Sequence, residues 1–162
     1  MFNDDIFNKM NALITLTGYL AVVSLCLLLF TPLSVKFKLV INQRILGLSI
    51  FYISLIHFIL YIIDNSFDIV FLWEDFLYRD YISVGYIALI LFIPMYLTSF
   101  DYFKNIFKNW KKIHRVIYLI TILILIHIYY VIKADYMYLY TFAFILLFIF
   151  ILKIYKYNNK HE

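Results

Sequence analysis

Three histidines are the residues of this chain whose type and position are best suited to chemistry. His57 and His127 each lie inside a long apolar stretch, and His114 stands just before the stretch that contains His127. An imidazole in hydrocarbon needs a hydrogen-bond partner or a metal ion, because an unpaired polar group is costly there. These three histidines are therefore the candidate functional residues, and His161, in the polar C-terminal tail, is assigned no role.

The spacing of these residues indicates that His57 and His127 lie at one depth in a membrane. His57 comes thirteen residues after Arg44, and His127 comes thirteen residues after His114. Arg44 and His114 mark the points where two apolar stretches enter from the same side. At about 1.5 Å per helical residue, both imidazoles are predicted about 20 Å from that edge. The sequence thus predicts a depth-matched pair on two parallel helices.

Such a pair suits the iron of a haem, which needs one nitrogen on each side of the macrocycle. Zinc is a poorer fit, because it takes three or four protein ligands and no Asp, Glu or Cys accompanies the pair at that depth. The simpler alternative is that each imidazole only hydrogen-bonds a helix carbonyl or a neighbouring Ser or Tyr. We predict that His57 and His127 are the axial ligands of a haem iron.

His114 has a different setting at the basic edge of its helix. On an ideal helix it faces about 140° away from His127. The second helix offers Gln43 and Arg44 at that level, so a second haem there would need an unusual ligand. Alternatively, His114 binds a haem propionate or a flavin phosphate together with Arg115 and Lys112, or it is an ordinary histidine of the membrane interface. These interpretations remain open.

The helices that carry the histidines belong to a membrane protein. The chain has 162 residues, of which 65% are hydrophobic and 22% aromatic, and a soluble domain of this size could not bury so much apolar surface. Five stretches approach the roughly 20 residues that cross a bilayer as a helix. The predicted fold is an all-α, polytopic membrane bundle of about five transmembrane helices, over residues 12–31, 45–63, 82–98, 116–132 and 136–152.

The charged residues lie outside these stretches and are sorted by side. One set of ends carries eleven of the fourteen basic residues: Lys36, Lys38, Arg44, Lys104, Lys108, Lys111, Lys112, Arg115, Lys153, Lys156 and Lys160. The other set carries most of the acidic residues. The positive-inside rule places the N-terminus outside and the C-terminus in the cytoplasm. We interpret the basic loops as contacts with anionic membrane lipid rather than with nucleic acid.

Other features divide the chain no further. The N-terminus lacks a signal-peptide cleavage pattern, so we expect the first apolar stretch to be retained. Segment 64–79 mixes acidic and apolar residues and is predicted to lie on the outer surface. The single cysteine, Cys26, excludes an intramolecular disulfide. With no internal repeat or linker, residues 1–162 are predicted to form a single haem-binding transmembrane domain.

A series of short motifs in order resembles the MsrQ (YedZ) family, the haem-binding membrane subunits of periplasmic methionine sulfoxide reductase systems in the ferric-reductase-like transmembrane superfamily. That family usually has one more helix before the Thr-Gly segment, and this chain begins too late to include it. The motifs span about Thr17 to Asp135: Thr17-Gly18, Thr31-Pro32, RILGL from Arg44, His57-Phe58 with Tyr61 and Asp64, YISVG from Tyr81, LTS at Leu97–Ser99, Trp110, IHRVIYL around His114, His127, and VIKAD ending at Asp135.

The resemblance implies haem b held by His57 and His127, with His114 as a haem-linked or flavin-linked position. It also implies FMN, a cytoplasmic flavin reductase or quinol as electron donor, a soluble periplasmic molybdopterin-containing reductase as partner, and a place in the bacterial inner membrane. Sulfoxide reduction is expected on that partner. The chain has no Gly-rich dinucleotide fingerprint, so electrons must come from a separate donor.

Two alternatives to an electron-transfer subunit remain open from the residues. One is a stand-alone transmembrane ferric or cupric reductase. The other is a non-redox membrane scaffold or proton-conducting bundle that uses its histidines as titratable groups.

Overall fold

The computed structural model of this chain describes residues 2–34, 42–132 and 136–158, and these form helices without any strand. Five of the helices are long and apolar enough to cross a membrane: Lys9–Leu33, Gln43–Asp64, Asp80–Leu97, Trp110–Val131 and Met137–Tyr155. The predicted all-α, multi-pass membrane bundle is thereby confirmed.

The chain runs through its helices in a simple order. The long helices are α1 (Phe2–Ser34), α2 (Gln43–Asp64), α4 (Asp80–Leu97), α7 (Ile117–Val131) and α8 (Met137–Asn158), and the short ones are α3 (Ile69–Tyr78), α5 (Asp101–Ile106) and α6 (Trp110–Ile113). A 3₁₀ turn, His114–Val116, joins α6 to α7. The first predicted helix, 12–31, is therefore too short, because the helix continues through the polar residues before it.

Polar caps explain where two of these helices begin. The Asn42 side chain accepts hydrogen bonds from the backbone N–H groups of Arg44 and Ile45 at the start of α2. Asp68 does the same for Val70 and Phe71 at the start of α3. Such caps satisfy N–H groups that have no partner within the helix. They set the entry points of α2 and of the short outer helix.

Pro32 shows why α1 is longer than its sequence suggests. It lies inside the last turn of α1, and proline cannot supply the N–H that the carbonyl of Leu28 would normally accept. The hydroxyl of Thr31 donates to that carbonyl at 2.7 Å. The helix therefore continues to Ser34 instead of ending at the proline.

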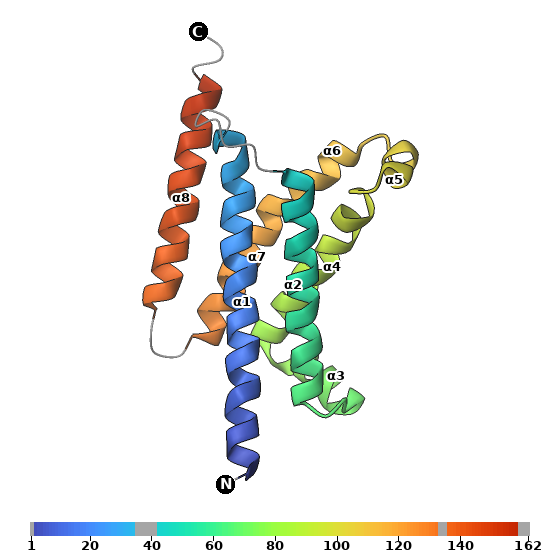
Figure 1. Cartoon of the computed structure of the whole chain (residues 1–162), viewed down its shortest axis with the longest axis vertical. Coiled ribbons are helices and arrows are strands. Elements are labelled where there is room, and N and C mark those ends of the chain that lie inside the picture. Colours follow the sequence, from blue (N-terminus) through green and yellow to red (C-terminus); the bar gives the residue numbers. More distant parts are fainter. Residues whose placement is uncertain (1, 35–41, 133–135, 159–162) are drawn as a thin grey trace.

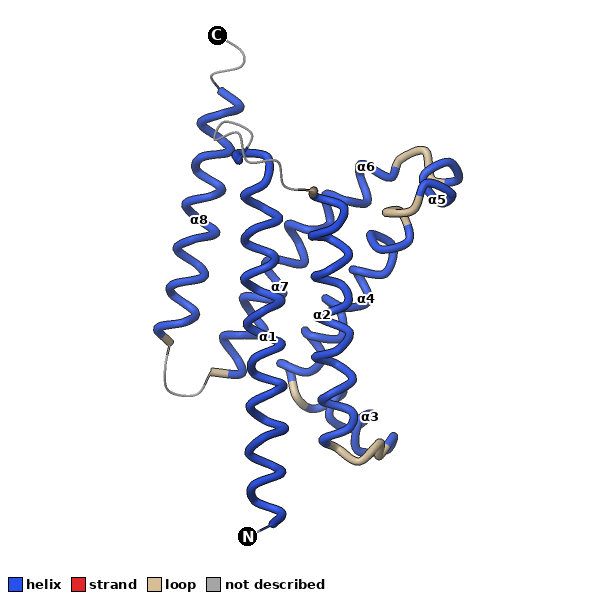
Figure 2. Tube along the Cα trace, viewed as in Figure 1, coloured by secondary structure: helices blue, strands red, loops and turns tan. Residues whose placement is uncertain are grey.

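The helices pack in two main pairs, α1 with α2 and α4 with α7, while α8 packs on α1 and α7. Figure 1 shows α3 at the end of the bundle where α1 begins, and α5 and α6 at the opposite end. Figure 2 shows α2 and α7 running in the same direction along the bundle. The core between the pairs is apolar: Leu25, Leu29, Leu33, Ile50, Ala88, Phe92, Met95, Ile117, Ile120 and Ile149.

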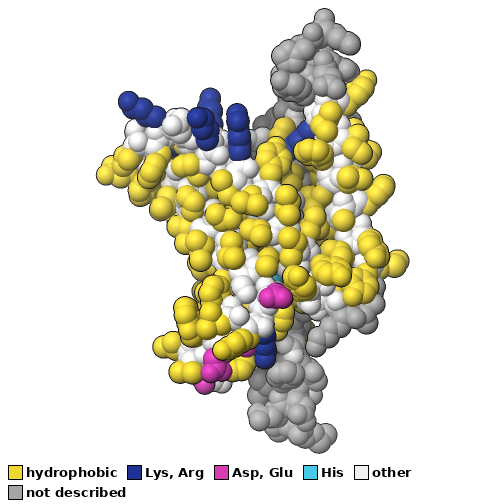
Figure 3. Space-filling model, turned by 180° about the vertical axis from the view of Figure 1, so that it is seen from behind, with side chains coloured by type: hydrophobic (Ala, Val, Ile, Leu, Met, Phe, Trp, Pro, Cys, Tyr) yellow, Lys and Arg dark blue, Asp and Glu magenta, His cyan; other side chains and the backbone are white. Residues whose placement is uncertain are grey.

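Charge separates the two ends of the bundle. In Figure 3 most Lys and Arg side chains gather at one end and Asp and Glu side chains toward the other, with hydrophobic side chains covering the surface between them. Many large apolar residues of the long helices are exposed there, including Leu16, Ile90 and Phe148. An apolar flank between charged ends is the surface that a bilayer requires.

Candidate functional site

His57 of α2 and His127 of α7 lie side by side in the bundle. Their ring centroids are 6.4 Å apart, and the ring planes are inclined at 85°. Both side chains are half-buried. The structure therefore brings the predicted pair together at one level of the bundle, which is what their equal spacing from Arg44 and His114 predicts.

A carbonyl of α1 holds the His57 ring. Nδ1 of His57 lies 2.9 Å from the backbone oxygen of Ile14 and 3.2 Å from Oγ1 of Thr17. The Thr17 hydroxyl itself donates to the carbonyls of Leu13 and Ile14, at 2.9 Å each. A carbonyl can only accept, so His57 carries its proton on Nδ1 and donates it to Ile14. The ring is thus fixed in one tautomer.

A carbonyl of α4 holds the His127 ring in the same way. Nδ1 of His127 lies 2.6 Å from the backbone oxygen of Tyr81. The proton is again on Nδ1, because the partner is an acceptor without a hydrogen of its own. In both histidines Nε2 is then the nitrogen with a free lone pair. Within the described part of the chain, no hydrogen bond uses either Nε2.

Glycine makes room for each ring. A Cβ on Gly18 would lie 3.3 Å from Cε1 of His57, and a Cβ on Gly85 would lie 3.1 Å from Cε1 and Nδ1 of His127. Gly18 follows Ile14 by four residues, and Gly85 follows Tyr81 by four residues. The accepting carbonyl and the glycine therefore lie one helical turn apart on the same face. Both histidines are held by one repeated arrangement, a carbonyl with a glycine four residues later.

The pair has the separation that a bis-imidazole metal centre requires. Two imidazoles on opposite sides of one metal ion, with metal–nitrogen bonds of about 2.0 to 2.1 Å, have ring centroids about 6.3 to 6.5 Å apart. The observed 6.4 Å lies within this range. The steep angle between the rings is compatible, since each axial ring turns about its own metal–nitrogen bond. A hydrogen bond from Nδ1–H to a carbonyl is also the usual support of a metal-binding histidine.

In residues 2–34, 42–132 and 136–158, three or more His, Cys, Asp or Glu side chains nowhere come together as a possible metal site. The donor set is therefore two imidazoles. That number suits a haem iron, whose remaining four ligands come from the macrocycle.

His114 lies in the 3₁₀ turn before α7, next to Arg115 and close in sequence to the lysines of α6. Its Nε2 is 3.1 Å from Oγ1 of Thr98, and the Thr98 hydroxyl donates to the carbonyl of Pro94 at 2.7 Å. Because the hydroxyl proton is already used, Nε2 of His114 carries a proton and donates to Thr98. The ring also meets Trp110 edge-on at 5.6 Å. His114 thus presents the opposite tautomer from the pair, with its free lone pair on Nδ1.

A cavity of about 520 Å³ opens beside His114, a size common for small-molecule sites. Its wall combines apolar and aromatic side chains with three cationic ones: Leu28, Leu29, Thr31, Pro32, Asn42, Gln43, Arg44, Gly47, Phe51, Phe92, Met95, Tyr96, Ser99, Lys104, Trp110, His114, Ile117, Tyr118 and Lys153. Phe51 and Tyr96 stack at 4.3 Å between ring centroids. The cavity therefore offers three cationic side chains to an anionic group.

The cations at this cavity are only partly those predicted from the sequence. Arg44 lines it, as does His114, whereas Arg115 and Lys112 are exposed and do not. Lys104 and Lys153 take their place. Lys112 and Arg115 were predicted to bind an anionic group because they are close to His114 in the sequence, but their side chains are exposed. Only the packing of α5 and α8 reveals the other two lysines.

Asp101 organises two of these cations. Its carboxylate accepts a hydrogen bond from Lys104 at 3.0 Å and lies 3.7 Å from Arg44. The hydrogen bond from Lys104, together with the charges of Lys104 and Arg44, holds the pKa of Asp101 below its ordinary value. Asp101 is therefore ionised at neutral pH and pairs with two of the cations that line the cavity.

Several contact residues were not identified as site residues from the sequence. Thr17 and Thr98 stand in the short motifs that carry the resemblance, so a signal for them existed without an assigned role. Tyr81 begins the YISVG motif, but neither its carbonyl nor that of Ile14 has a signature of its own, because every residue has a carbonyl. Only the tertiary structure shows which of them meets an imidazole.

Most of the chain matches a known protein family. The family model of the ferric reductase like transmembrane component matches residues 17–125. His57 and His114 fall inside the match, and His127 lies two residues beyond it. No solved structure matches significantly.

The chain is also similar to curated proteins named protein-methionine-sulfoxide reductase heme-binding subunit MsrQ. It is 36% identical to that of Agrobacterium fabrum over 75% of this chain and 59% of the relative. It is 35% identical to that of Caulobacter vibrioides over 61% and 49%, and 34% identical to that of Rhodospirillum rubrum over 58% and 47%. The chain spans about half the length of the curated relatives that it matches.

These matches confirm the resemblance stated from the motifs, and the family match covers α2 and the first part of α7, up to residue 125. The match over residues 17–125 covers most of the chain. The chain belongs to the ferric reductase like transmembrane component family, among the relatives of its MsrQ heme-binding subunits.

Proposed function

We propose that this chain is the haem-binding membrane subunit of a protein-methionine-sulfoxide reductase system, folded as one domain over residues 1–162 and seated in a bacterial inner membrane. His57 and His127 bind the iron of a b-type haem. The observation that carries this proposal is their 6.4 Å separation, with Nδ1 of each ring tied to a carbonyl. The names of the relatives support the cofactor and the system.

The residues of the chain contribute binding and orientation. When bound, haem b supplies a one-electron carrier inside the membrane. The carbonyls of Ile14 and Tyr81 hold the Nδ1 protons, so Nε2 of each histidine keeps its lone pair for the iron. Gly18 and Gly85 leave the space that each ring occupies. The surrounding apolar helices exclude water from the pair.

Electrons enter from the basic side and leave on the acidic side in this proposal. The basic end would face the cytoplasm, with the N-terminus outside and the C-terminus inside. The donor is then a cytoplasmic flavin reductase or a membrane quinol, and the acceptor is a periplasmic molybdopterin-containing methionine sulfoxide reductase. Sulfoxide reduction takes place on that partner. The sorting of charge in Figure 3 supports this orientation.

The cavity beside His114 is the proposed entry site. His114 and His127 are thirteen residues apart, about 20 Å along a helix, which is a long distance for an electron to tunnel. A second cofactor at the cavity, either a second haem or FMN, would divide that distance. Arg44, Lys104 and Lys153 would bind its propionates or phosphate, because cationic side chains pair strongly with such anions.

Difference spectroscopy of the purified protein tests this proposal. The reduced-minus-oxidised absorption spectrum of the wild type, expressed with ample haem, is expected to show a low-spin b-type haem. His57→Ala and His127→Ala should each abolish it, and His114→Ala should retain it while losing any second centre. A colourless, folded wild type, or unchanged spectra in both members of the pair, would refute the haem assignment.

The family match also keeps a second candidate function in view, a stand-alone ferric or cupric reductase. Purified, pre-reduced protein separates the two. Oxidation by chelated Fe(III) or Cu(II) at a rate matching that of the periplasmic reductase would favour the alternative. Fast oxidation by the reductase alone would favour the electron-transfer subunit.

A further inference from the structure

The carbonyl that orients His127, that of Tyr81, belongs to the first turn of α4, which lacks a side-chain cap. Tyr81 is the second residue of α4, and the N-cap residue of that helix, Arg79, makes no side-chain capping hydrogen bond. The first turn of a helix frays most easily, because its N–H groups have no partner within the helix. The carbonyl of Ile14, by contrast, lies well inside α1. Something outside α4 must therefore hold the turn that carries Tyr81.

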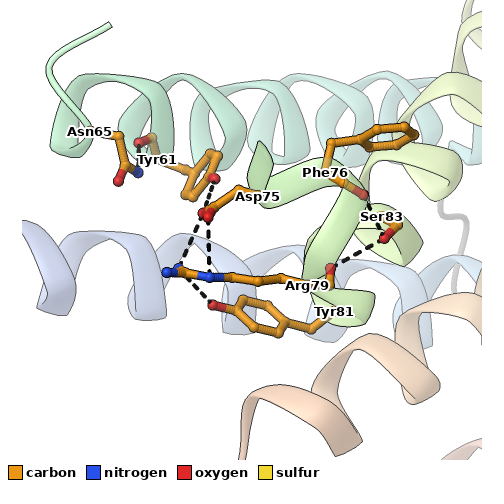
Figure 4. A network of polar contacts seen from close by, with 7 residues as sticks. All are labelled: Tyr61, Asn65, Asp75, Phe76, Arg79, Tyr81 and Ser83. Atoms are coloured by element: carbon orange, nitrogen blue, oxygen red, sulfur yellow. Dashed lines mark hydrogen bonds and ion pairs between the residues drawn. The ribbon is translucent and has the colours of Figure 1, made fainter. Parts of the chain in front are cut away.

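A polar network of α3 meets that turn, as Figure 4 shows. The Arg79 guanidinium makes a two-point ion pair with Asp75, with Nε 3.1 Å from Oδ1 and Nη1 3.1 Å from Oδ2. Nη1 also donates to the Tyr81 hydroxyl at 3.3 Å. One helical turn further along, the Ser83 hydroxyl donates to the carbonyl of Phe76 in α3 at 3.0 Å. The first turn of α4 is thereby fastened to α3.

Asp75 is the centre of this network. The residue is only 4% exposed, although α3 lies at the surface of the bundle and many of its apolar side chains are exposed. A buried carboxylate is costly unless it is paired and hydrogen-bonded. Asp75 meets that condition, because Tyr61 of α2 donates to Oδ2 at 2.8 Å in addition to the contacts from Arg79. A residue held this way favours one arrangement of the three helices.

The same network reaches the helix of the other histidine. Tyr61 follows His57 by four residues on α2, so the two side chains share one face of that helix. Asp75 therefore links the helix that carries His57 to the turn whose carbonyl holds His127.

We propose that Asp75 and Arg79 are positioning residues for His127: they join α2, α3 and the first turn of α4, and so aim the Tyr81 carbonyl at Nδ1 of the imidazole. The proposal rests on the proposed function, in which His127 binds the haem iron. Loosening the link lengthens the hydrogen bond from Nδ1–H. The imidazole then becomes a weaker electron donor to the iron, and the reduced haem is favoured over the oxidised one.

The test compares Asp75→Asn with Glu74→Gln. Both variants remove one carboxylate from α3 and preserve side-chain size, but Glu74 is exposed. Asp75→Asn should raise the midpoint potential of the haem and weaken haem binding about 10- to 100-fold, as loss of an outer-shell partner commonly does. Glu74→Gln should leave both unchanged. Tyr81→Phe, which removes only the hydroxyl contact of Arg79, should shift the potential in the same direction but less.

Two outcomes would overturn the proposal. One is an unchanged potential and haem affinity in both Asp75→Asn and Tyr81→Phe. The other is an equal shift in Glu74→Gln, which would show that only surface charge matters. If Asp75→Asn does not fold, Tyr81→Phe decides the question, since that change removes only the exposed hydrogen bond from Arg79 to the Tyr81 hydroxyl.

A second readout needs no haem and separates this proposal from the proposed function. In haem-free protein labelled with ¹⁵N-histidine, the Nδ1–H resonance of His127 reports its hydrogen bond to Tyr81. Asp75→Asn should move this resonance and Glu74→Gln should not. A wild type without haem would refute the proposed function, while the resonance would still confirm or refute the positioning role. An unmoved resonance in Asp75→Asn would refute it.

Discussion

Replacing Gly85 with alanine tests the arrangement that holds His127. The new methyl group would lie 3.1 Å from Cε1 and Nδ1 of the ring, whereas ordinary contacts begin at 3.4 Å, so the ring must give by a few tenths of an ångström. The methyl group stands on the helix that supplies the Tyr81 carbonyl. The displacement therefore also lengthens the 2.6 Å hydrogen bond from Nδ1.

The expected size of the effect follows from this crowding. Overpacking a tight site costs about 1 to 3 kcal/mol, which corresponds to haem binding weakened about 5- to 150-fold. Gly18→Ala should have a smaller effect of the same kind, because its methyl group would lie 3.3 Å from the His57 ring. Gly47→Ala is the matched control for the haem of His57 and His127 only: nothing lies within 4 Å of its added methyl group, and Gly47 lines the separate cavity beside His114.

The assay is a haem titration of the three purified variants and the wild type, followed by the absorption of the bound form. For the haem of His57 and His127, the predicted order of affinity is Gly47→Ala equal to wild type, then Gly18→Ala, then Gly85→Ala. Alanine also favours the helix by up to about 1 kcal/mol over glycine, so any stability change in Gly47→Ala should be a gain. Equal haem affinity in Gly85→Ala and Gly47→Ala would refute the view that Gly85 exists to admit the ring.

Two further predictions concern the basic end and the orientation of the chain. Arg44→Gln should weaken the binding of FMN or of a second haem at the cavity about tenfold or more, because one charge-assisted contact is lost. Lys112→Gln is the control and should leave equilibrium binding unchanged, since Lys112 is exposed and lies outside the cavity. Equal losses of affinity in the two variants would contradict the assignment of Arg44 to this site. In a Cys26→Ser background, a membrane-impermeant thiol reagent applied to intact cells should label a cysteine placed at Glu74 and spare one placed at Lys108; the reverse pattern would invert the proposed topology.

Much of the fold follows from the sequence because membrane insertion depends on local composition. Five apolar stretches bounded by charged residues identify the spanning helices without knowledge of their packing. Their ends were less predictable, as the continuation of α1 through Pro32 shows. There the hydroxyl of Thr31 donates to the carbonyl of Leu28, which would otherwise accept the N–H that proline lacks. A prediction based on hydrophobic composition does not reveal such a hydrogen bond.

The sequence likewise predicts the histidines of the candidate site but not their hydrogen-bond partners. The choice of His57 and His127, and their common depth, follow from residue type and from the constant rise of a helix. Their partners could not be predicted, because a carbonyl has no signature in the sequence and becomes a partner only where two helices cross. The role of Asp75 could not be predicted either, because its segment, 64–79, mixes acidic and apolar residues and is predicted to lie on the surface. The path of α3 buries that one carboxylate against Tyr61 and Arg79, because pairing there offsets the loss of water.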